Sequence, residues 1–413
     1  MMFSKRIRFF LSFGFVFLFA AIGYTTQTAQ TVGQTIGQIA TQTTDQKILE
    51  PSETIRLYEQ ITNIDRVPVI TCIDLEKNGR LLAIGGDDCV VRLWDVQTKG
   101  FIRELQEHLD WVRGLAFSPD QTRLATVGQD GQIKLWDVQN GTLVRSLKGF
   151  IRGTQKVLFH PNGSQFAVCG FEKNVRIYDA ASGDLLKTLE THGTSNKAIA
   201  FSPEGSLLAV SGRTGVIRVW KTSGYQQLTD LKGDGRRVHT VAFSPDGSQL
   251  ASGGDGPFIM IWKPTDGTLL QSLQERPGKT FSLVFCGKTL LASGESDNAI
   301  RIWDITQNRN TLTLLGHTGT ISTMIYEAAS NRLISGSFDT SLRFWILPED
   351  SVPSQQMTTI PSITTPTTTD SPVAATPIPT IPTMTAPAEP VPTLKSPFDE
   401  PINTTTLSIP IAF

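Results

Sequence analysis

Two sets of residues combine a histidine, a hydroxyl side chain, a carboxylate and a tryptophan at the same offsets. They are His108, Thr126, Asp130 and Trp136, and His317, Ser335, Asp339 and Trp345. A hydroxyl beside a histidine and a carboxylate can carry out nucleophilic acyl transfer, with the histidine taking the proton of the attacking oxygen. The chemistry that these residue types suggest is therefore hydrolysis.

The surroundings of both sets argue against catalysis. A catalytic hydroxyl must be exposed beside donors that stabilise an oxyanion, whereas Ser335 lies mid-strand near a large indole. The set also occurs twice, as a building element would, and buried polar groups need partners. We therefore interpret both sets as structural. We predict that the chain is not an enzyme, with no catalytic residue, metal site or cofactor.

The elements that must position these residues repeat along the chain. An aromatic residue closes the same short alternating run seven times, in steps of 42 residues and once of 41: Trp94, Trp136, Tyr178, Trp220, Trp262, Trp303 and Trp345. Before each aromatic, apolar residues alternate with polar ones, as a pleated strand requires. A period of this length with strand patterns predicts a β-propeller.

Each repeat contains turn signals that divide it into four strands. One such turn is Ser244-Pro245-Asp246-Gly247, where proline presets the turn and glycine supplies positive φ. The last repeat stops after its third strand, while Thr54–Glu59 offers one spare strand before the first. Unpaired edges promote aggregation, so we expect this N-terminal strand to complete the last blade and close the ring. The predicted fold is all-β, a seven-bladed propeller of four-stranded antiparallel blades.

These residues resemble the WD40 repeat family over about residues 52–349. Trp-Asp pairs stand at Trp94-Asp95, Trp136-Asp137 and Trp303-Asp304, and Gly316-His317 provides a Gly-His pair, with His108 and His192 in equivalent places. The resemblance implies a disc with a central channel, used as a protein-binding scaffold. It also implies that the His, Ser or Thr, Asp and Trp positions form a hydrogen-bonded tetrad within a blade. Tyr178 departs from the family pattern, and the third and fifth repeats lack the histidine.

The resemblance further implies which loops share a face. Loops that lead into first strands and loops that join second to third strands lie together, and binding is expected on loops of a rigid scaffold. Aromatic residues and arginine are enriched in binding hot spots. On this face we predict partner contacts from Trp111, Phe171, Arg213, Arg237, Phe258 and Phe338.

The ends of the chain differ from the repeats. Residues 1–24 join a basic head to an apolar run, which predicts a signal peptide or signal anchor. Residues 25–50 are rich in Thr and Gln and predict a linker, and residues 51–349 form the propeller. Residues 350–413 are rich in Pro, Thr and Ser and predict a disordered tail.

The whole pattern predicts a non-catalytic protein-protein interaction scaffold outside the cytoplasm, periplasmic or secreted, with membrane anchoring as an alternative. The partner is a protein or peptide, and the propeller is monomeric. A net charge of −1 gives no general attraction to nucleic acid, so none is expected as a partner. The alternatives are an extracytoplasmic propeller enzyme, lactonase-like or quinoprotein-like, and a cytosolic WD40 scaffold.

Overall fold

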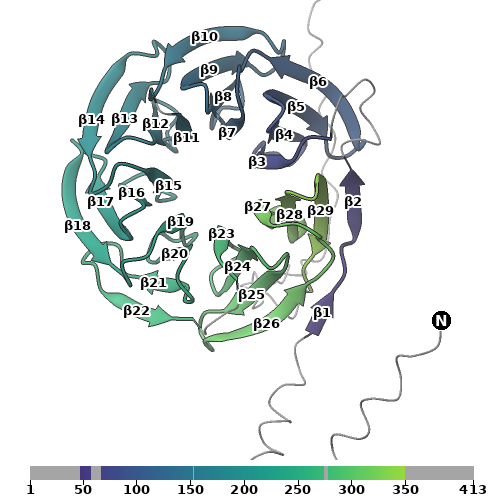
Figure 1. The fold of residues 1–413 in the computed structure, drawn as a ribbon, viewed down its shortest axis with the longest axis vertical. Coiled ribbons are helices and arrows are strands. Elements are labelled where there is room, and N and C mark those ends of the chain that lie inside the picture. Colours follow the sequence, from purple (N-terminus) through teal and green to yellow (C-terminus); the bar gives the residue numbers. More distant parts are fainter. Residues whose placement is uncertain (1–46, 57–66, 152, 274–277, 349–413) are drawn as a thin grey trace, which may run out of the picture. The chain divides into compact units, whose positions relative to one another are not determined.

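The computed structural model describes residues 47–56, 67–151, 153–273 and 278–348. These residues form seven small sheets, antiparallel except for one added edge strand, arranged in a ring around a central opening (Figure 1). The predicted all-β, seven-bladed propeller is thereby confirmed. In each blade one strand lies next to the centre and the others follow outwards (Figure 1).

In blades 1 to 4, the four strands follow one another in the sheet in the same order as in the chain. Blade 1 consists of β3 (Ile70–Leu75), β4 (Leu81–Gly86), β5 (Val90–Asp95) and β6 (Gly100–Gln106). Blade 2 consists of β7 (Val112–Phe117), β8 (Arg123–Gly128), β9 (Gln132–Asp137) and β10 (Leu143–Lys148). Blade 3 consists of β11 (Thr154–Phe159), β12 (Gln165–Gly170), β13 (Asn174–Asp179) and β14 (Leu185–Glu190). Blade 4 consists of β15 (Asn196–Phe201), β16 (Leu207–Gly212), β17 (Val216–Lys221) and β18 (Gln226–Lys232).

The remaining blades include the two N-terminal strands. Blade 5 consists of β19 (Val238–Phe243), β20 (Leu250–Gly254), β21 (Met260–Trp262) and β22 (Leu269–Ser272). Blade 6 consists of β23 (Thr280–Phe285), β24 (Leu290–Glu295), β25 (Ile300–Asp304), β26 (Arg309–Leu314) and β1 (Lys47–Leu49). Blade 7 consists of β27 (Ile321–Glu327), β28 (Arg332–Ser337), β29 (Ser341–Ile346) and β2 (Glu53–Arg56), with a short 3-10 helix, η2 (Ala328–Ser330), between β27 and β28.

The hydrophobic core consists of layers between neighbouring blades. Between blades 7 and 1, for example, Ile70 and Trp94 pack with Ile334 and Phe344, all almost fully buried. Six further clusters of the same kind fill the other interfaces. Because a small sheet cannot bury its faces alone, each blade depends on both of its neighbours.

Strand β2 closes the ring. It pairs antiparallel with β29, from Glu53 opposite Phe344 to Arg56 opposite Ser341, and Ile55 is buried in the layer between blades 7 and 1. This confirms that an N-terminal strand completes the last blade. The predicted strand ran to Glu59, and its last three residues lie outside the described part of the chain.

Strand β1 was not expected, because residues 47–49 belong to the stretch that we predicted as a linker. This strand pairs in parallel with the outer edge of blade 6, with Lys47 opposite Leu312 and Leu49 opposite Leu314. Ile48 is exposed and Leu49 packs on the edge of the core. A strand of three residues is too short to show the alternation of apolar and polar residues that predicts a strand. Pairing of its backbone with the free edge of β26 explains why it forms.

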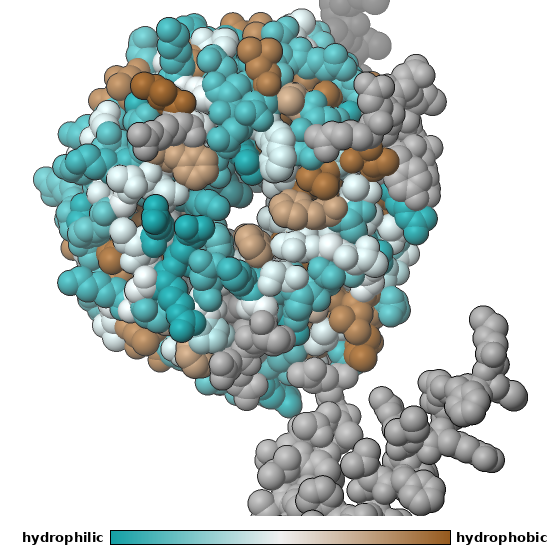
Figure 2. All heavy atoms as spheres, in the orientation of Figure 1, coloured by the Kyte–Doolittle hydropathy of each residue, from teal (hydrophilic) through white to brown (hydrophobic). Residues whose placement is uncertain are grey.

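Two kinds of loop meet at one end of each blade. The loop between the second and third strands donates a backbone hydrogen bond to a residue just before the first strand. Examples are Gln129 to Trp111 at 2.8 Å and Phe338 to Thr320 at 3.0 Å. We call the side of the ring that carries these loops the top face. Figure 2 shows a central opening with hydrophilic side chains gathered beside it.

The predicted N-terminal signal or anchor (1–24), most of the linker (25–46) and the tail (350–413) lie outside the described residues. Within the part of the chain that the structure describes, no helix has the length and apolar character needed to cross a membrane.

Candidate functional site

The two sets of chemically suggestive residues form hydrogen-bonded chains inside blades 2 and 7. In blade 2, His108 Nδ1 lies 2.8 Å from Asp130 Oδ2, His108 Nε2 lies 2.8 Å from Thr126 Oγ1, and Trp136 Nε1 donates to Thr126 Oγ1 at 2.9 Å. In blade 7 the corresponding distances among His317, Asp339, Ser335 and Trp345 are 2.8, 2.8 and 2.9 Å. The two blades therefore contain the same construction.

Each chain of hydrogen bonds has one consistent direction. An indole nitrogen can only donate and an ionised carboxylate can only accept, so the hydroxyl donates to His Nε2 and His Nδ1 donates to the carboxylate. A neutral histidine satisfies this pattern. Burial lowers the pKa of His317, against the opposing effect of its hydrogen bond to Asp339, and so favours the neutral form. Burial alone would raise the pKa of Asp339, but hydrogen bonds from His317 and Ser341 hold it far below its usual range.

The hydroxyls in these chains are inaccessible. Thr126 and Ser335 are both 0% exposed, and each already accepts an indole N–H. A nucleophile needs contact with its substrate. The geometry therefore suits a structural element that fastens the second and third strands to a top-face loop.

The other tryptophan blades vary the construction. In blade 6, Trp303 Nε1 donates to Ser293 Oγ at 2.8 Å, and Ser293 Oγ donates to the fully buried Glu295 at 2.8 Å, so a carboxylate takes the place of the imidazole. In blade 1, Ile84 stands where blades 2, 5, 6 and 7 have a hydroxyl, and valine holds this position in blades 3 and 4. Trp94 Nε1 is consequently buried with no hydrogen-bond partner among the described residues.

Blades 3 and 4 replace the construction more thoroughly. In blade 3 the histidine position holds Phe150, which is 0% exposed and carries the guanidinium of Arg176 at 4.3 Å from its ring centre. In blade 4, His192 turns outwards, and its Nε2 lies 2.7 Å from Asp230 Oδ2. His192 therefore has the expected position in the sequence but forms no tetrad.

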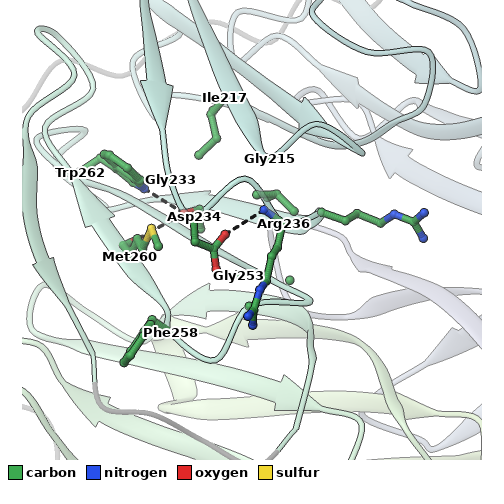
Figure 3. A pocket seen from close by; sticks show the side chains of 14 residues that line it. Gly215, Ile217, Gly233, Asp234, Arg236, Gly253, Phe258, Met260 and Trp262 are labelled. Atoms are coloured by element: carbon green, nitrogen blue, oxygen red, sulfur yellow. Dashed lines mark hydrogen bonds between the residues drawn. The ribbon is translucent and has the colours of Figure 1, made fainter.

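Blade 5 leaves a small cavity where the histidine and aspartate would lie. Asp234 and Gly256 occupy these two positions, while Trp262 Nε1 still donates to Ser252 Oγ at 2.8 Å. The cavity has a volume of about 20 Å³, enough for a single water molecule. Figure 3 shows Asp234 between Trp262 and Arg236, with Phe258 at the rim.

The six residues predicted to contact a partner all lie on or beside top-face loops. Trp111, Phe258 and Phe338 are 37%, 39% and 46% exposed. Arg213 is exposed, whereas Phe171 and Arg237 are partly buried. The structure distributes the six over blades 2, 3, 4, 5 and 7, and Arg237 and Phe258 line the same small cavity. Whether they bind a partner stays a prediction.

The sequence reasoning missed two apolar residues on the same face. Leu109 is 86% exposed and Ile151 is 95% exposed, and they lie on the loops that lead into the first strands of blades 2 and 3. The alignment of the repeats places both residues on top-face loops, but it does not show that their side chains are exposed. Among the described residues, no group of His, Cys, Asp and Glu could hold a metal ion.

Comparison with known families gives two matches. Residues 53–220, which span β2, blades 1 to 3 and most of the first three strands of blade 4, match the model of the Nucleolar protein 10-like, N-terminal domain. Residues 225–263 and 308–345 match the WD domain, G-beta repeat. The matched families are non-catalytic scaffolds, which confirms the prediction that the chain is not an enzyme and removes the lactonase-like and quinoprotein-like alternatives.

Individual relatives match over short stretches. Ribosome biogenesis protein YTM1 of Chaetomium globosum is 32% identical over 85 residues, 19% of this chain and 18% of the relative. Cell division control protein 4 of Saccharomyces cerevisiae is 40% identical over 58 residues, 14% of this chain and 7% of the relative. Nuclear distribution protein PAC1 of Coprinopsis cinerea is 50% identical over 44 residues, 11% of this chain and 10% of the relative. The chain thus spans less than a fifth of each relative.

The predicted extracytoplasmic location, periplasmic or secreted, is wrong by these comparisons. The model that matches residues 53–220 is that of a nucleolar protein, and relatives are named for ribosome biogenesis. The prediction depended on a few basic residues followed by a short apolar run at the N-terminus. This pattern reflects only the local hydrophobicity and gives no information about the propeller that follows.

The repeat period, the closed ring, the tetrads of blades 2 and 7 and the two family matches agree with one another. The chain contains WD40 repeats and folds as a seven-bladed β-propeller.

Proposed function

We propose that this protein is an intracellular, non-catalytic scaffold whose top face binds a partner protein. WD40 propellers bind proteins, and the matched relatives include proteins named for ribosome biogenesis and nuclear distribution. These names support an intracellular location, as in the cytosolic alternative, over export. They also make the assembly of ribosomal particles the first process in which to look for the partner.

One observation carries the proposal: the top-face loops expose large apolar side chains. Leu109, Trp111 and Ile151 are exposed on the loops that lead into blades 2 and 3, and Phe258 and Phe338 are exposed farther round the ring. Exposed aromatic and aliphatic groups on a rigid frame are the usual anchors of protein interfaces. The tetrads serve this surface indirectly, since each fixes a top-face loop to the buried strands beneath it.

Affinity capture tests the proposal. The full chain and its Trp111→Ala/Arg237→Ala variant are used as baits in extracts of the source organism, with Leu186→Ala/Lys187→Ala as the matched control. Leu186 and Lys187 are exposed on the outer strand β14, away from the top face. We expect the top-face variant to lose the specific partners and the control to keep them. Equal capture by both variants would refute binding through this face.

Cell fractionation tests the location. We expect the full chain in the intracellular or nuclear fraction. Recovery only outside the cytoplasm would contradict the proposal.

A further inference from the structure

Each innermost strand contains a bulge at the same place near the top face. The pairing with the second strand skips one residue there, for example between Val112 and Gly114 in blade 2 and between Asn196 and Ala198 in blade 4. The skipped residues around the ring are Thr71, Arg113, Gln155, Lys197, His239, Phe281 and Ser322. A bulge redirects the side chain of its extra residue, so these seven surround the upper mouth of the central channel.

Blades 7 and 1 use this position for structure. Ser322 Oγ donates to the carbonyl of Ile70 at 2.6 Å, and Thr71 Oγ1 donates to the carbonyl of Val112 at 2.5 Å. Both hydroxyls tie their blade to the next one. In blades 2 to 5 the same position holds an arginine, a glutamine, a lysine and a histidine, which are donors of much greater reach.

Gln155 is the most informative of these residues. It is 9% exposed, and its amide nitrogen Nε2 has no hydrogen-bond partner among the described residues. Arg113 occupies the corresponding bulge of blade 2, on one side of Gln155, and Lys197 occupies that of blade 4, on the other side. Arg237, one residue before β19, likewise has a buried Nε without a partner in the described part of the chain. Buried donors without partners destabilise a fold, and an acceptor supplied by a ligand would satisfy them. We name Arg113, Gln155, Lys197 and Arg237 the cationic arc.

The charges of the cationic arc repel one another. Burial lowers the pKa of Lys197, and the positive charges of Arg237 and Arg113 lower it further. Asp255, the acid that acts on Lys197, is already engaged by His239 Nε2 at 3.0 Å and by Lys279 Nζ at 3.2 Å, while Asp110 partly offsets the charge of Arg113. Figure 2 shows strongly hydrophilic side chains beside the central opening, over blades 4 and 5. Arg113 Nε donates to Gln129 Oε1 at 3.2 Å, so the unfilled buried donors of the cationic arc, within the described residues, are those of Gln155 and Arg237. Such donors beside partly desolvated cations are suited to an anion.

Apolar groups border the cationic arc on one side. The guanidinium of Arg113 lies 4.5 Å from the ring centre of Trp111, which holds both side chains in place. Leu109 is exposed on the same loop as Trp111, and Ile151 is exposed on the corresponding loop of blade 3. A ligand that fits both features carries a negative charge next to apolar residues.

We propose that the cationic arc binds the oxyanion of an acidic or phosphorylated side chain in a peptide segment of the partner protein. Apolar residues next to that side chain contact Leu109, Trp111 and Ile151. This inference rests on the proposed scaffold function and specifies the chemistry of the partner. It adds Arg113, Gln155 and Lys197 to the binding face. Their common spacing of 42 residues is visible in the sequence, but the bulge that redirects them is not.

Fluorescence anisotropy with three labelled, C-terminally amidated hexapeptides tests the inference on the full chain. One peptide has two glutamates between leucines, the second has phosphoserine in place of one glutamate, and the third has glutamines. The variants are Lys197→Gln and Gln155→Leu, and the matched control is Lys187→Gln on the outer strand β14. Thermal melting verifies that each variant is folded. We expect Lys197→Gln to melt no lower than the parent, because it removes a desolvated like charge.

The inference predicts that an anionic peptide binds at least tenfold more tightly than the glutamine peptide. Lys197→Gln should weaken this binding at least fivefold and Gln155→Leu at least threefold, while Lys187→Gln leaves it unchanged. The tighter of the two anionic peptides identifies carboxylate or phosphate as the source. Equal binding of all three peptides, or no binding of either anionic peptide, would overturn the inference. If capture still depends on Trp111 and Arg237 in that case, the scaffold function stands without the anion site.

Discussion

Trp345 donates its indole N–H to Ser335 Oγ at 2.9 Å, and three further blades contain the same bond. Trp94 of blade 1 cannot form it, because Ile84 stands at the hydroxyl position and leaves Trp94 Nε1 buried without a partner among the described residues. Two almost fully buried tryptophans with the same place in their blades therefore differ in one hydrogen bond.

This difference predicts unequal effects of the same substitution. Trp345→Phe should lower the free energy of unfolding more than Trp94→Phe, by about 1–3 kcal/mol, because only the first loses a satisfied buried donor. Both changes remove similar volume, so each variant is the control for the other. Urea unfolding monitored by circular dichroism measures the difference. Equal losses would show that the indole hydrogen bond contributes nothing.

The tetrad of blade 7 predicts a loss of stability in mild acid. Burial lowers the pKa of His317 below its ordinary 6.5, so between these two values the unfolded chain binds a proton that the folded chain does not. The free energy of unfolding should therefore fall as the pH drops below about 6.5. The lowered pKa of Asp339 adds a second loss only below its ordinary 3.8.

Urea unfolding between pH 8 and pH 5 tests the histidine contribution. The His317→Gln variant should show a shallower fall with decreasing pH than the parent. His239, whose pKa is also lowered by burial, keeps some slope in both proteins. Identical slopes in the parent and the variant would contradict a neutral His317 in the folded state.

Blade 5 predicts a coupling between two substitutions that restore the tetrad residues. A Cβ at position 256 would lie too close to Asp234 Oδ2, so Gly256→Asp alone should lower the melting temperature through overlap and like charge. Asp234→His removes that conflict and supplies the missing imidazole. The double variant should be more stable than the two single effects predict, with a coupling of about 1 kcal/mol or more. A double-mutant cycle by thermal melting measures it, and additive effects would contradict the assigned positions.

Ring closure predicts a long-range effect of one residue in the N-terminal strand. Ile55 on β2 is 7% exposed and packs between blades 7 and 1, so Ile55→Ala should cost about 2–4 kcal/mol and shift a single unfolding transition. Ile48 on β1 is 59% exposed, and Ile48→Ala is the matched control with little expected effect. Unchanged melting of Ile55→Ala would show that the ring does not depend on β2.

The sequence determined the fold well because the fold repeats. Seven aromatics at a fixed period, alternating third strands and one missing final strand together required a closed seven-bladed ring. Strand β1 was beyond such reasoning, since it forms through backbone pairing to an edge with almost no apolar pattern.

The candidate site was less predictable. Connectivity showed which loops share the top face, but not that Leu109 and Ile151 would be exposed there. The cationic arc depends on bulges, which change the direction of single side chains. The alternation of apolar and polar residues along the strands does not reveal where these bulges lie. The predicted extracytoplasmic location was wrong because the N-terminal sequence pattern gives no information about the proteins that the propeller resembles.

Hydrogen–deuterium exchange of the full chain, free and bound to its captured partner, tests most directly that the top face is the binding surface. We expect slower exchange on binding in the top-face loops, at residues 107–111, 149–151, 213–215 and 233–237. We expect no change in the turns at the opposite end of the blades, such as residues 119–122 and 203–206. Protection confined to those opposite turns, or to the outer strands, would contradict it.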